Sequence, residues 1–103
     1  MNEREKLGLA PFDASDYLDN EEIIAEYLSV TLEDPDPDAF LTAVRDVAKA
    51  RGIANVAARA GLGRESLYKT LRSGAKPRLE TVRRLLAALD VKLDVSPLKE
   101  RVG

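Results

Sequence analysis

The segment 64–69 carries five side chains that can form hydrogen bonds with the edges of DNA bases. Leu67 and Leu71 lie four residues apart, so a helix over this segment turns both of them toward a core. The other face then presents the polar residues Arg64, Glu65, Ser66, Tyr68 and Lys69, with Ser66 at its edge. Arg64 suits the O6 and N7 acceptors of guanine, and Glu65 can accept from a cytosine amine. We therefore predict base contacts in a major groove, and we also expect Tyr68 to pack in part at the rim of the core.

A second group of residues predicts contacts with DNA phosphates. Its members, besides Lys69, are Asn55, Arg59, Arg72, Lys76 and Arg78. Residues 45–92 contain 12 basic and 4 acidic side chains, a net charge of +8, although the whole chain carries only −2. A positive excess on the segment that holds the candidate base contacts favours a polyanionic partner such as double-stranded DNA. Solvated helix faces are the alternative interpretation of the same charges.

The front of the chain carries the opposite charge. Residues 1–44 contain 12 acidic and 2 basic side chains, a net charge of −10. Such a segment is suited to a basic protein partner, or to covering the chain's own basic face. For any single acidic residue, such as Asp19 or Glu33, simple solvation of a helix surface is the preferred interpretation.

The composition excludes most enzyme chemistry. The 103 residues include no cysteine and no histidine, which removes thiol nucleophiles, the Ser-His-Asp arrangement, and thiolate or imidazole metal sites. Ser66 has no base, and the carboxylates fall on solvent faces without a Gly-rich phosphate loop or the spacing of metal ligands. We therefore expect no catalytic residue, no metal and no cofactor. No apolar run approaches the roughly 20 residues of a membrane span, and the charged N-terminus does not resemble a signal peptide. The expected location is the cytoplasm, without membrane contact.

The elements that must position the candidate contacts match a helix-turn-helix. We predict one short helix over 55–60 and a second over 64–72, joined by a tight turn. The small Ala57 lets the helices cross closely, and Gly61 supplies the positive φ that ends the first helix. Leu62 fills the space between the helices, and Leu67 fixes the second helix against the core. Its polar face is then free to enter a major groove about 12 Å wide.

Further helices are predicted on both sides of this pair. Apolar periodicity predicts a helix over 19–33, with Asp19 or Asn20 as its cap. A second begins with Asp36 as cap and Pro37 in the first position, and it ends at the Arg51–Gly52 pair. An apolar stripe predicts a third over 79–89. Residues 91–95 alternate like a five-residue strand, which would need a partner strand from another chain.

These elements predict an all-α fold: five helices that include a helix-turn-helix, with a short C-terminal strand. The expected divisions are a flexible tail over 1–11, an acidic N-terminal helical segment over 12–35, the DNA-binding domain over 36–95, and a second tail over 96–103.

A resemblance to a known family supports this prediction. The carrying motifs are Phe12-Asp13 through Tyr17-Leu18, Glu26-Tyr27-Leu28, residues 48–52, the string AGLGRESLYKTL over 60–71, Pro77, and residues 85–93. Over residues 12–95, about four fifths of the chain, the sequence resembles the probable addiction-module antidote proteins, which are HigA-like antitoxins with a lambda-repressor (Xre) helix-turn-helix. The resemblance implies a homodimer that represses its own operon and neutralises a RelE/HigB-type ribonuclease toxin.

Two residues depart from the pattern of that family, and two other functions stay open. Ala54 and Arg78 stand where such domains place small capping hydroxyl residues, and we expect Asn55 to cap the first helix of the pair instead. One alternative function is a stand-alone Xre-type transcriptional regulator. The other is a helical protein-interaction module whose turn is only structural.

Overall fold

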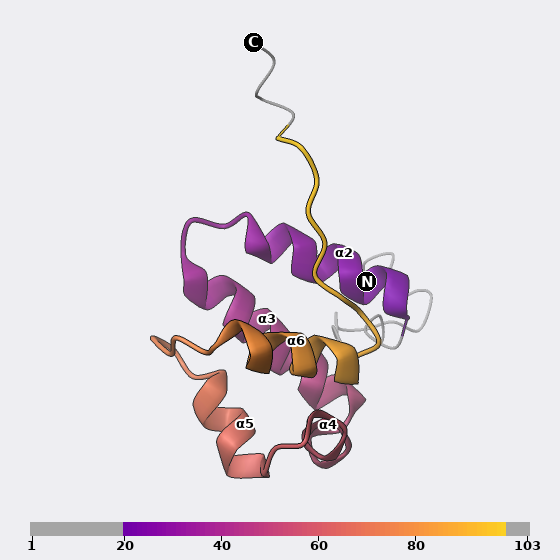
Figure 1. The fold of residues 1–103 in the computed structure, drawn as a ribbon, viewed down its shortest axis with the longest axis vertical. Coiled ribbons are helices and arrows are strands. Elements are labelled where there is room, and N and C mark those ends of the chain that lie inside the picture. Colours follow the sequence, from indigo (N-terminus) through magenta and orange to yellow (C-terminus); the bar gives the residue numbers. More distant parts are fainter. Residues whose placement is uncertain (1–19, 99–103) are drawn as a thin grey trace, which may run out of the picture.

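The computed structural model describes residues 20–98, and within them the chain forms five helices and no strand (Figure 1). In chain order the helices are α2 (Glu21–Leu32), α3 (Pro37–Arg51), α4 (Ile53–Ala60), α5 (Arg64–Thr70) and α6 (Leu79–Ala88). The all-α helix-turn-helix class is confirmed. The predictions for residues 1–19 and 99–103, including the tail over 1–11 and the motifs at 12–18, lie outside the described residues.

The boundaries of α2 and α3 follow the predicted caps. The Asn20 carboxamide accepts hydrogen bonds from two main-chain N–H groups of the first turn of α2, at 2.8 and 3.2 Å. Asp36 caps α3 by accepting from the N–H two residues further on, at 2.9 Å, and Pro37 occupies the first helical position. α3 ends at Arg51, where Gly52 takes a φ of 98° that a side chain disfavours. These boundaries depend on local chemistry, which a sequence displays directly.

α4 begins two residues earlier than predicted. It starts at Ile53, and Gly52 is its N-cap without a side-chain hydrogen bond. The prediction that Asn55 caps this helix is therefore wrong, and Ala54 lies within the first turn rather than at the cap. The physical reason is that Gly52 turns the chain directly from α3 into α4, so one glycine both ends the first helix and precedes the second.

The last two helices are slightly shorter than predicted. α5 ends at Thr70 rather than at residue 72, and α6 ends at Ala88 rather than at residue 89. Arg78 is the N-cap of α6 and makes no side-chain capping bond, which confirms the expected departure at that position. None of the helices between residues 20 and 98 combines the length and the apolar character needed to cross a bilayer.

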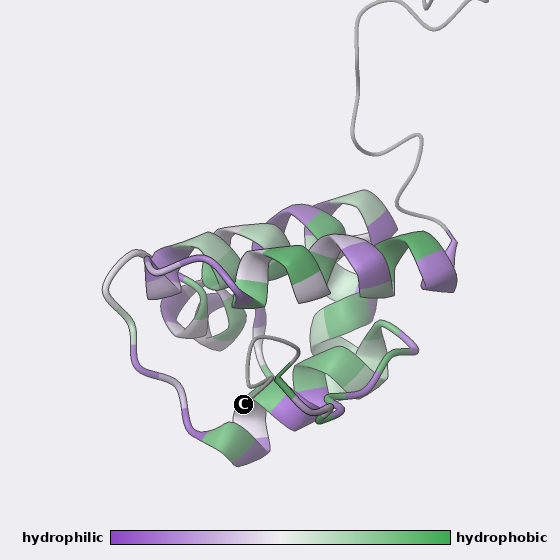
Figure 2. Ribbon diagram, turned by 90° about the horizontal axis from the view of Figure 1, so that it is seen from above, coloured by the Kyte–Doolittle hydropathy of each residue, from purple (hydrophilic) through white to green (hydrophobic). Residues whose placement is uncertain are grey.

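One apolar core holds the five helices together. Its most deeply buried side chains come from every helix and include Ile24, Val47, Val56, Leu67 and Leu85. α2 packs against α3, while α4 contacts α3, α5 and α6. In Figure 2 hydrophobic and hydrophilic stretches alternate along each helix, as amphipathic helices require. The acidic α2 thus shares its core with the helix-turn-helix.

The predicted strand over 91–95 is wrong for the described chain. These residues run as an extended segment without a paired ladder, and this segment passes α2 in Figure 1. Val91 and Leu93 are half-buried against the core, whereas Lys92 and Asp94 are exposed. Val95, the third apolar residue of the pattern, is 93% exposed. Burial therefore alternates over residues 91–94 only, and its cause is an extended chain that packs one side on helices. Within residues 20–98 no neighbouring strand supplies hydrogen-bonding partners.

Candidate nucleic-acid interface

The turn between α4 and α5 has the geometry that its sequence predicts. Gly61 ends α4 in the left-handed region, with φ 73° and ψ 31°, and its N–H donates back into the last turn. The Leu62 N–H donates to the Ala57 carbonyl at 2.8 Å, which closes the helix end in a Schellman-type arrangement. Ala57 is buried and Leu62 is half-buried, as a close crossing of two helices requires.

Arg84 of α6 holds this turn from behind. Its Nε donates to the Ala60 carbonyl at 3.0 Å, and its Nη2 donates to the Gly61 carbonyl at 3.1 Å. A Cβ on Gly61 would lie 2.6 Å from the same Nη2. The glycine is therefore favoured by its backbone conformation, and a side chain in its place would push the end of the flexible Arg84 side chain away from its present position. Arg84 places a positive charge beside the carbonyls at the C-terminal end of α4, which carries partial negative charge. It also fixes the direction in which the chain enters α5.

α5 presents the predicted base-contacting residues on one face. Leu67 is fully buried and Leu71 nearly so, which anchors the inner side of the helix. The outer side consists of exposed residues, namely Arg64, Glu65, Ser66, Tyr68 and Lys69. Tyr68 is 40% exposed, so its ring is partly covered by the protein while a large part faces solvent.

The outer face of α5 has polar side chains that the rest of the described chain does not engage. Among residues 20–98, no hydrogen bond or ion pair involves the side chains of Arg64, Glu65, Tyr68 or Lys69. The Ser66 hydroxyl makes no hydrogen bond among these residues either, while the Ser66 carbonyl accepts from the Thr70 hydroxyl at 2.8 Å. These donors and acceptors are thus available to a ligand, which is the condition for direct readout of base edges.

The candidate phosphate contacts fall into two groups. Asn55 is exposed on α4, while Arg72, Lys76 and Arg78 are exposed in the connection from α5 to α6. Arg59 differs from these, because its Nη2 lies 2.9 Å from Asp90 Oδ1. Part of its charge is therefore neutralised within the protein, and a phosphate would have to compete with a carboxylate for it.

Asp90 connects the end of α6 to α3 and α4. It follows α6 with a φ of 64°, and it accepts from Arg59 of α4 and, at 3.4 Å, from Arg51 of α3. The pKa of Asp90 is lowered from its usual value, chiefly by the hydrogen bond from Arg59, with both arginine charges adding to the effect. This exposed ion pair sets the orientation of α4 more than it adds stability.

Asp38 fixes the loop that follows α5. Its carboxylate accepts from the Ser73 hydroxyl at 2.6 Å and from the Gly74 N–H at 2.9 Å. Both hydrogen bonds lower the pKa of Asp38, and the bond from Ser73 has the larger effect. They connect the first turn of α3 to the basic loop that carries Lys76, and so limit the positions that this loop can take.

Arg84, Asp90 and Asp38 were not identified as functional residues from the sequence. Each one looks like an ordinary charge on a helix surface or helix end, and its partner lies 23 to 39 residues away in the chain. The sequence signal available for Arg84 was only its place near the inner edge of the α6 stripe. Within the described residues no cluster of acidic side chains could hold a metal ion.

The chain is similar to known proteins over most of its length. The family model described as "Probable addiction module antidote protein" matches residues 8–97. An uncharacterized protein of Haemophilus influenzae is 36% identical over 87 residues, which cover 84% of this chain and 90% of the relative. No solved structure shows significant similarity to the chain.

Proposed function

The chain belongs to the family of probable addiction module antidote proteins, and from this premise we propose that it is the antitoxin of a type II toxin-antitoxin module that also represses its own operon. It binds operator DNA through α5 and neutralises a RelE/HigB-type ribonuclease toxin. The observation that carries the DNA-binding part is the exposed, unengaged polar face of α5, held on a buried leucine and beside a basic loop.

The division of labour on DNA follows from position. Arg64 at the start of α5 reaches base edges in the major groove, supported by Glu65, Tyr68 and Lys69 further along the same face. The DNA backbone on either side of these bases is contacted by Asn55, Arg72, Lys76 and Arg78. Arg59 joins them when its guanidinium leaves the Asp90 carboxylate for a phosphate. A homodimer presents two such helices about one DNA turn apart and reads a two-fold symmetric operator.

The toxin-binding part is supported by α2. Its outward residues include the acidic Glu22 and Glu26, together with the exposed apolar side chains of Ile23 and Val30. Acidic groups around apolar anchors suit a basic protein surface, because charges steer the encounter and the apolar contacts hold the complex. A ribonuclease that binds RNA carries such a basic surface.

DNA binding is tested by fluorescence anisotropy with labelled duplex from immediately upstream of the gene and with scrambled duplex, across a salt series. We expect tighter binding to the upstream duplex, weakening as salt rises, and loss of this preference in Arg64→Ala. Lys49→Ala is the matched control, since it removes one exposed cation from α3 instead of α5. Equal, weak binding of the unaltered protein to both duplexes would contradict operator recognition.

Toxin binding is tested by co-purification with the product of the neighbouring gene. Deleting residues 1–35 is unsuitable, because Ile24 and Leu28 belong to the core. We expect Glu26→Lys to weaken the complex about tenfold or more at low salt, and the matched variant Glu65→Lys, which alters an exposed glutamate of α5, to leave it intact. A protein that binds its operator but no neighbouring gene product is a stand-alone regulator. If the double variant Arg64→Ala/Lys69→Ala keeps both operator binding and toxin binding, α5 is only structural.

A further inference from the structure

A groove of about 440 Å³ lies where the turn between α2 and α3 meets the loop between α5 and α6, two connections on the left of Figure 1. Its apolar lining comes from these two connections and from α3 and α6, namely Pro35, Pro37, Phe40, Leu41, Pro77 and Val82. We name it the corner groove. Small-molecule sites have volumes of about 300–1,000 Å³, so this groove is large enough for a ligand with one large apolar group.

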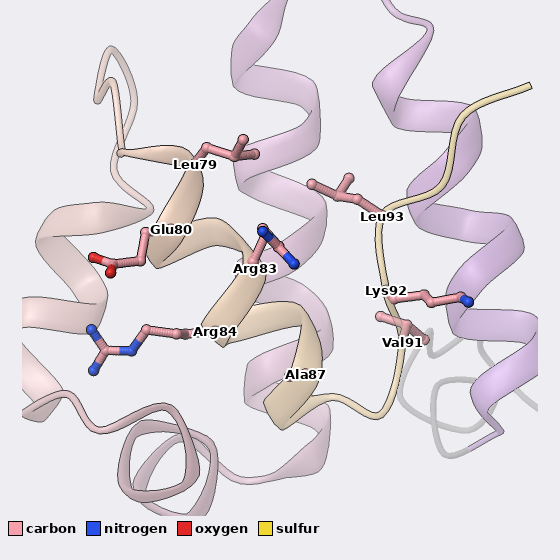
Figure 3. A pocket seen from close by; sticks show the side chains of 8 residues that line it. All are labelled: Leu79, Glu80, Arg83, Arg84, Ala87, Val91, Lys92 and Leu93. Atoms are coloured by element: carbon pink, nitrogen blue, oxygen red, sulfur yellow. The ribbon is translucent and has the colours of Figure 1, made fainter.

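The corner groove differs from the larger hollow beside α6. That hollow, of about 720 Å³, lies between α6 and the extended segment that follows it, and it shares no lining residue with the groove (Figure 3). Four of the eight residues that line the hollow are charged, but only three of the thirteen that line the corner groove are. A mostly apolar surface with a few polar groups is typical of small-molecule sites. The corner groove is therefore the better candidate for such a ligand.

The two walls of the corner groove are held in place by the protein itself. Asp38 of α3 accepts from the Ser73 hydroxyl and from the Gly74 N–H, so one carboxylate joins the walls. In the turn, Asp34 Oδ1 accepts from the Asp36 N–H at 2.8 Å. The prolines in both walls restrict the main chain further. A preformed site of this kind loses little conformational freedom when a ligand binds.

The rim of the groove offers one group to an anion and one to a cation. Lys76 lines the groove, is exposed, and takes part in no hydrogen bond or ion pair within residues 20–98. Asp34 also lines it, and in the same part of the chain only its Oδ1 accepts a hydrogen bond. Asp38, by contrast, uses both carboxylate oxygens to hold the loop. A ligand that carries a carboxylate and an ammonium group therefore finds a partner for each.

We propose that the corner groove binds a free amino acid with a large apolar side chain, whose carboxylate pairs with Lys76, whose ammonium group pairs with Asp34, and whose side chain packs on Phe40 and the prolines. Lys76 is also one of the proposed phosphate contacts, so the bound carboxylate competes with DNA for its charge. Only this competition rests on the proposed function. None of the proposed base contacts lines the groove, so the ligand lowers DNA affinity without changing sequence preference.

The first test titrates the isotope-labelled full chain with four probes and follows its main-chain N–H signals by NMR. L-phenylalanine carries the apolar group and both charges. Phenethylamine lacks the carboxylate, phenylpropionate lacks the ammonium group, and glycine lacks the apolar group. We expect L-phenylalanine to shift the signals of Gly74 and Ala75, which line the groove. It should bind about two- to fivefold more tightly than phenethylamine or phenylpropionate, which is the effect of one exposed ion pair. Glycine should leave these signals unchanged.

Two variants assign the charges of the ligand to their partners. Lys76→Met keeps the aliphatic stem and removes the cation, so it should abolish the preference for L-phenylalanine over phenethylamine. Asp34→Asn keeps an oxygen for the turn and should abolish the preference over phenylpropionate. The matched controls, Arg72→Met and Glu33→Gln, change exposed charges that do not line the groove and should keep both preferences. Loop signals that no probe shifts, or preferences that survive in the first two variants, would overturn the site.

The second test repeats the anisotropy measurement with the upstream duplex in saturating L-phenylalanine, with glycine at the same concentration as the control. We expect the unaltered protein to bind DNA about two- to fivefold more weakly, since one exposed contact with a phosphate is lost, and Lys76→Met to show no response. L-phenylalanine that binds in the groove but leaves DNA affinity unchanged would overturn the competition for Lys76. A protein that binds L-phenylalanine as expected but does not prefer its upstream duplex would support the site and contradict operator recognition.

Discussion

Replacing Gly61 with alanine disturbs two features of the helix-turn-helix at once. The residue has a φ of 73°, which L side chains rarely adopt. The new Cβ would also lie 2.6 Å from Nη2 of Arg84, so the guanidinium must move away from the carbonyls of Ala60 and Gly61. The substitution therefore tests both the left-handed turn and the clamp that α6 places on it.

The expected loss of stability has two parts. A non-glycine residue in the left-handed region costs about 1–2 kcal/mol. Loss of the two charged hydrogen bonds from Arg84, at a partly exposed site, costs about 1–2 kcal/mol in total. We therefore expect Gly61→Ala to lower the free energy of unfolding by about 2–4 kcal/mol, a large share of the stability of a small domain. Gly74 is the matched control, because its φ is 80° and a methyl group on it would have no other atom within 4 Å, so Gly74→Ala bears only the backbone cost.

Urea unfolding followed by circular dichroism measures these differences. Arg84→Ala alone should cost about 1–2 kcal/mol, and the double variant with Gly61→Ala should cost less than the sum of the two by about the same amount. The reason is that the methyl group no longer displaces a bond that is already absent. Strict additivity, or equal effects of Gly61→Ala and Gly74→Ala, would refute the clamp by Arg84.

Two further predictions concern charge. The pKa values of Asp38 and Asp90 are lowered by hydrogen bonds from Ser73 and Arg59, so their contribution to stability is present above about pH 4, the unfolded value, and is lost as pH falls through the lower folded values. The melting temperature of Asp90→Asn should therefore fall less steeply below about pH 4 than that of the unaltered protein. An equally steep fall in both proteins would contradict this. Lys69→Ala should lower the salt dependence of DNA affinity by about one unit of log–log slope if the residue contacts a phosphate, and an unchanged slope with altered sequence preference would assign it to a base.

The features that the sequence predicts correctly are those with local causes. Asp36, Pro37 and Gly52 define the limits of α3 because capping, a fixed proline φ and a positive glycine φ each act within a few residues. The same holds for Gly61 at the end of α4. The outward face of α5 was also predictable, because two leucines four residues apart decide which side of a helix is buried.

The features that the sequence does not reveal depend on contacts between distant residues. Whether Arg84 is a solvent-facing charge or a clamp depends on the crossing of α6 over the end of α4, 23 residues away. The error over residues 91–95 has a related origin. Alternating apolar residues indicate that one side of an extended chain is covered, and a helical surface covers Val91 and Leu93 as well as a sheet would.

The internal ion pairs change how the basic excess of the chain should be understood. Arg51 and Arg59 are paired with Asp90, and Arg84 is engaged by carbonyls, so these three cations stabilise the frame around the turn. The cations of α5 and of the following loop have no such partners among residues 20–98. In the DNA-free protein, fewer cations are therefore available to DNA than the net charge of residues 45–92 suggests. The remaining cations are concentrated on α5 and the loop that follows it, and this concentration favours binding there. Arg59 lies between the two groups. If DNA recruits it, Asp90 loses its main partner, and binding should weaken the tie between α4 and α6 that Asp90 provides.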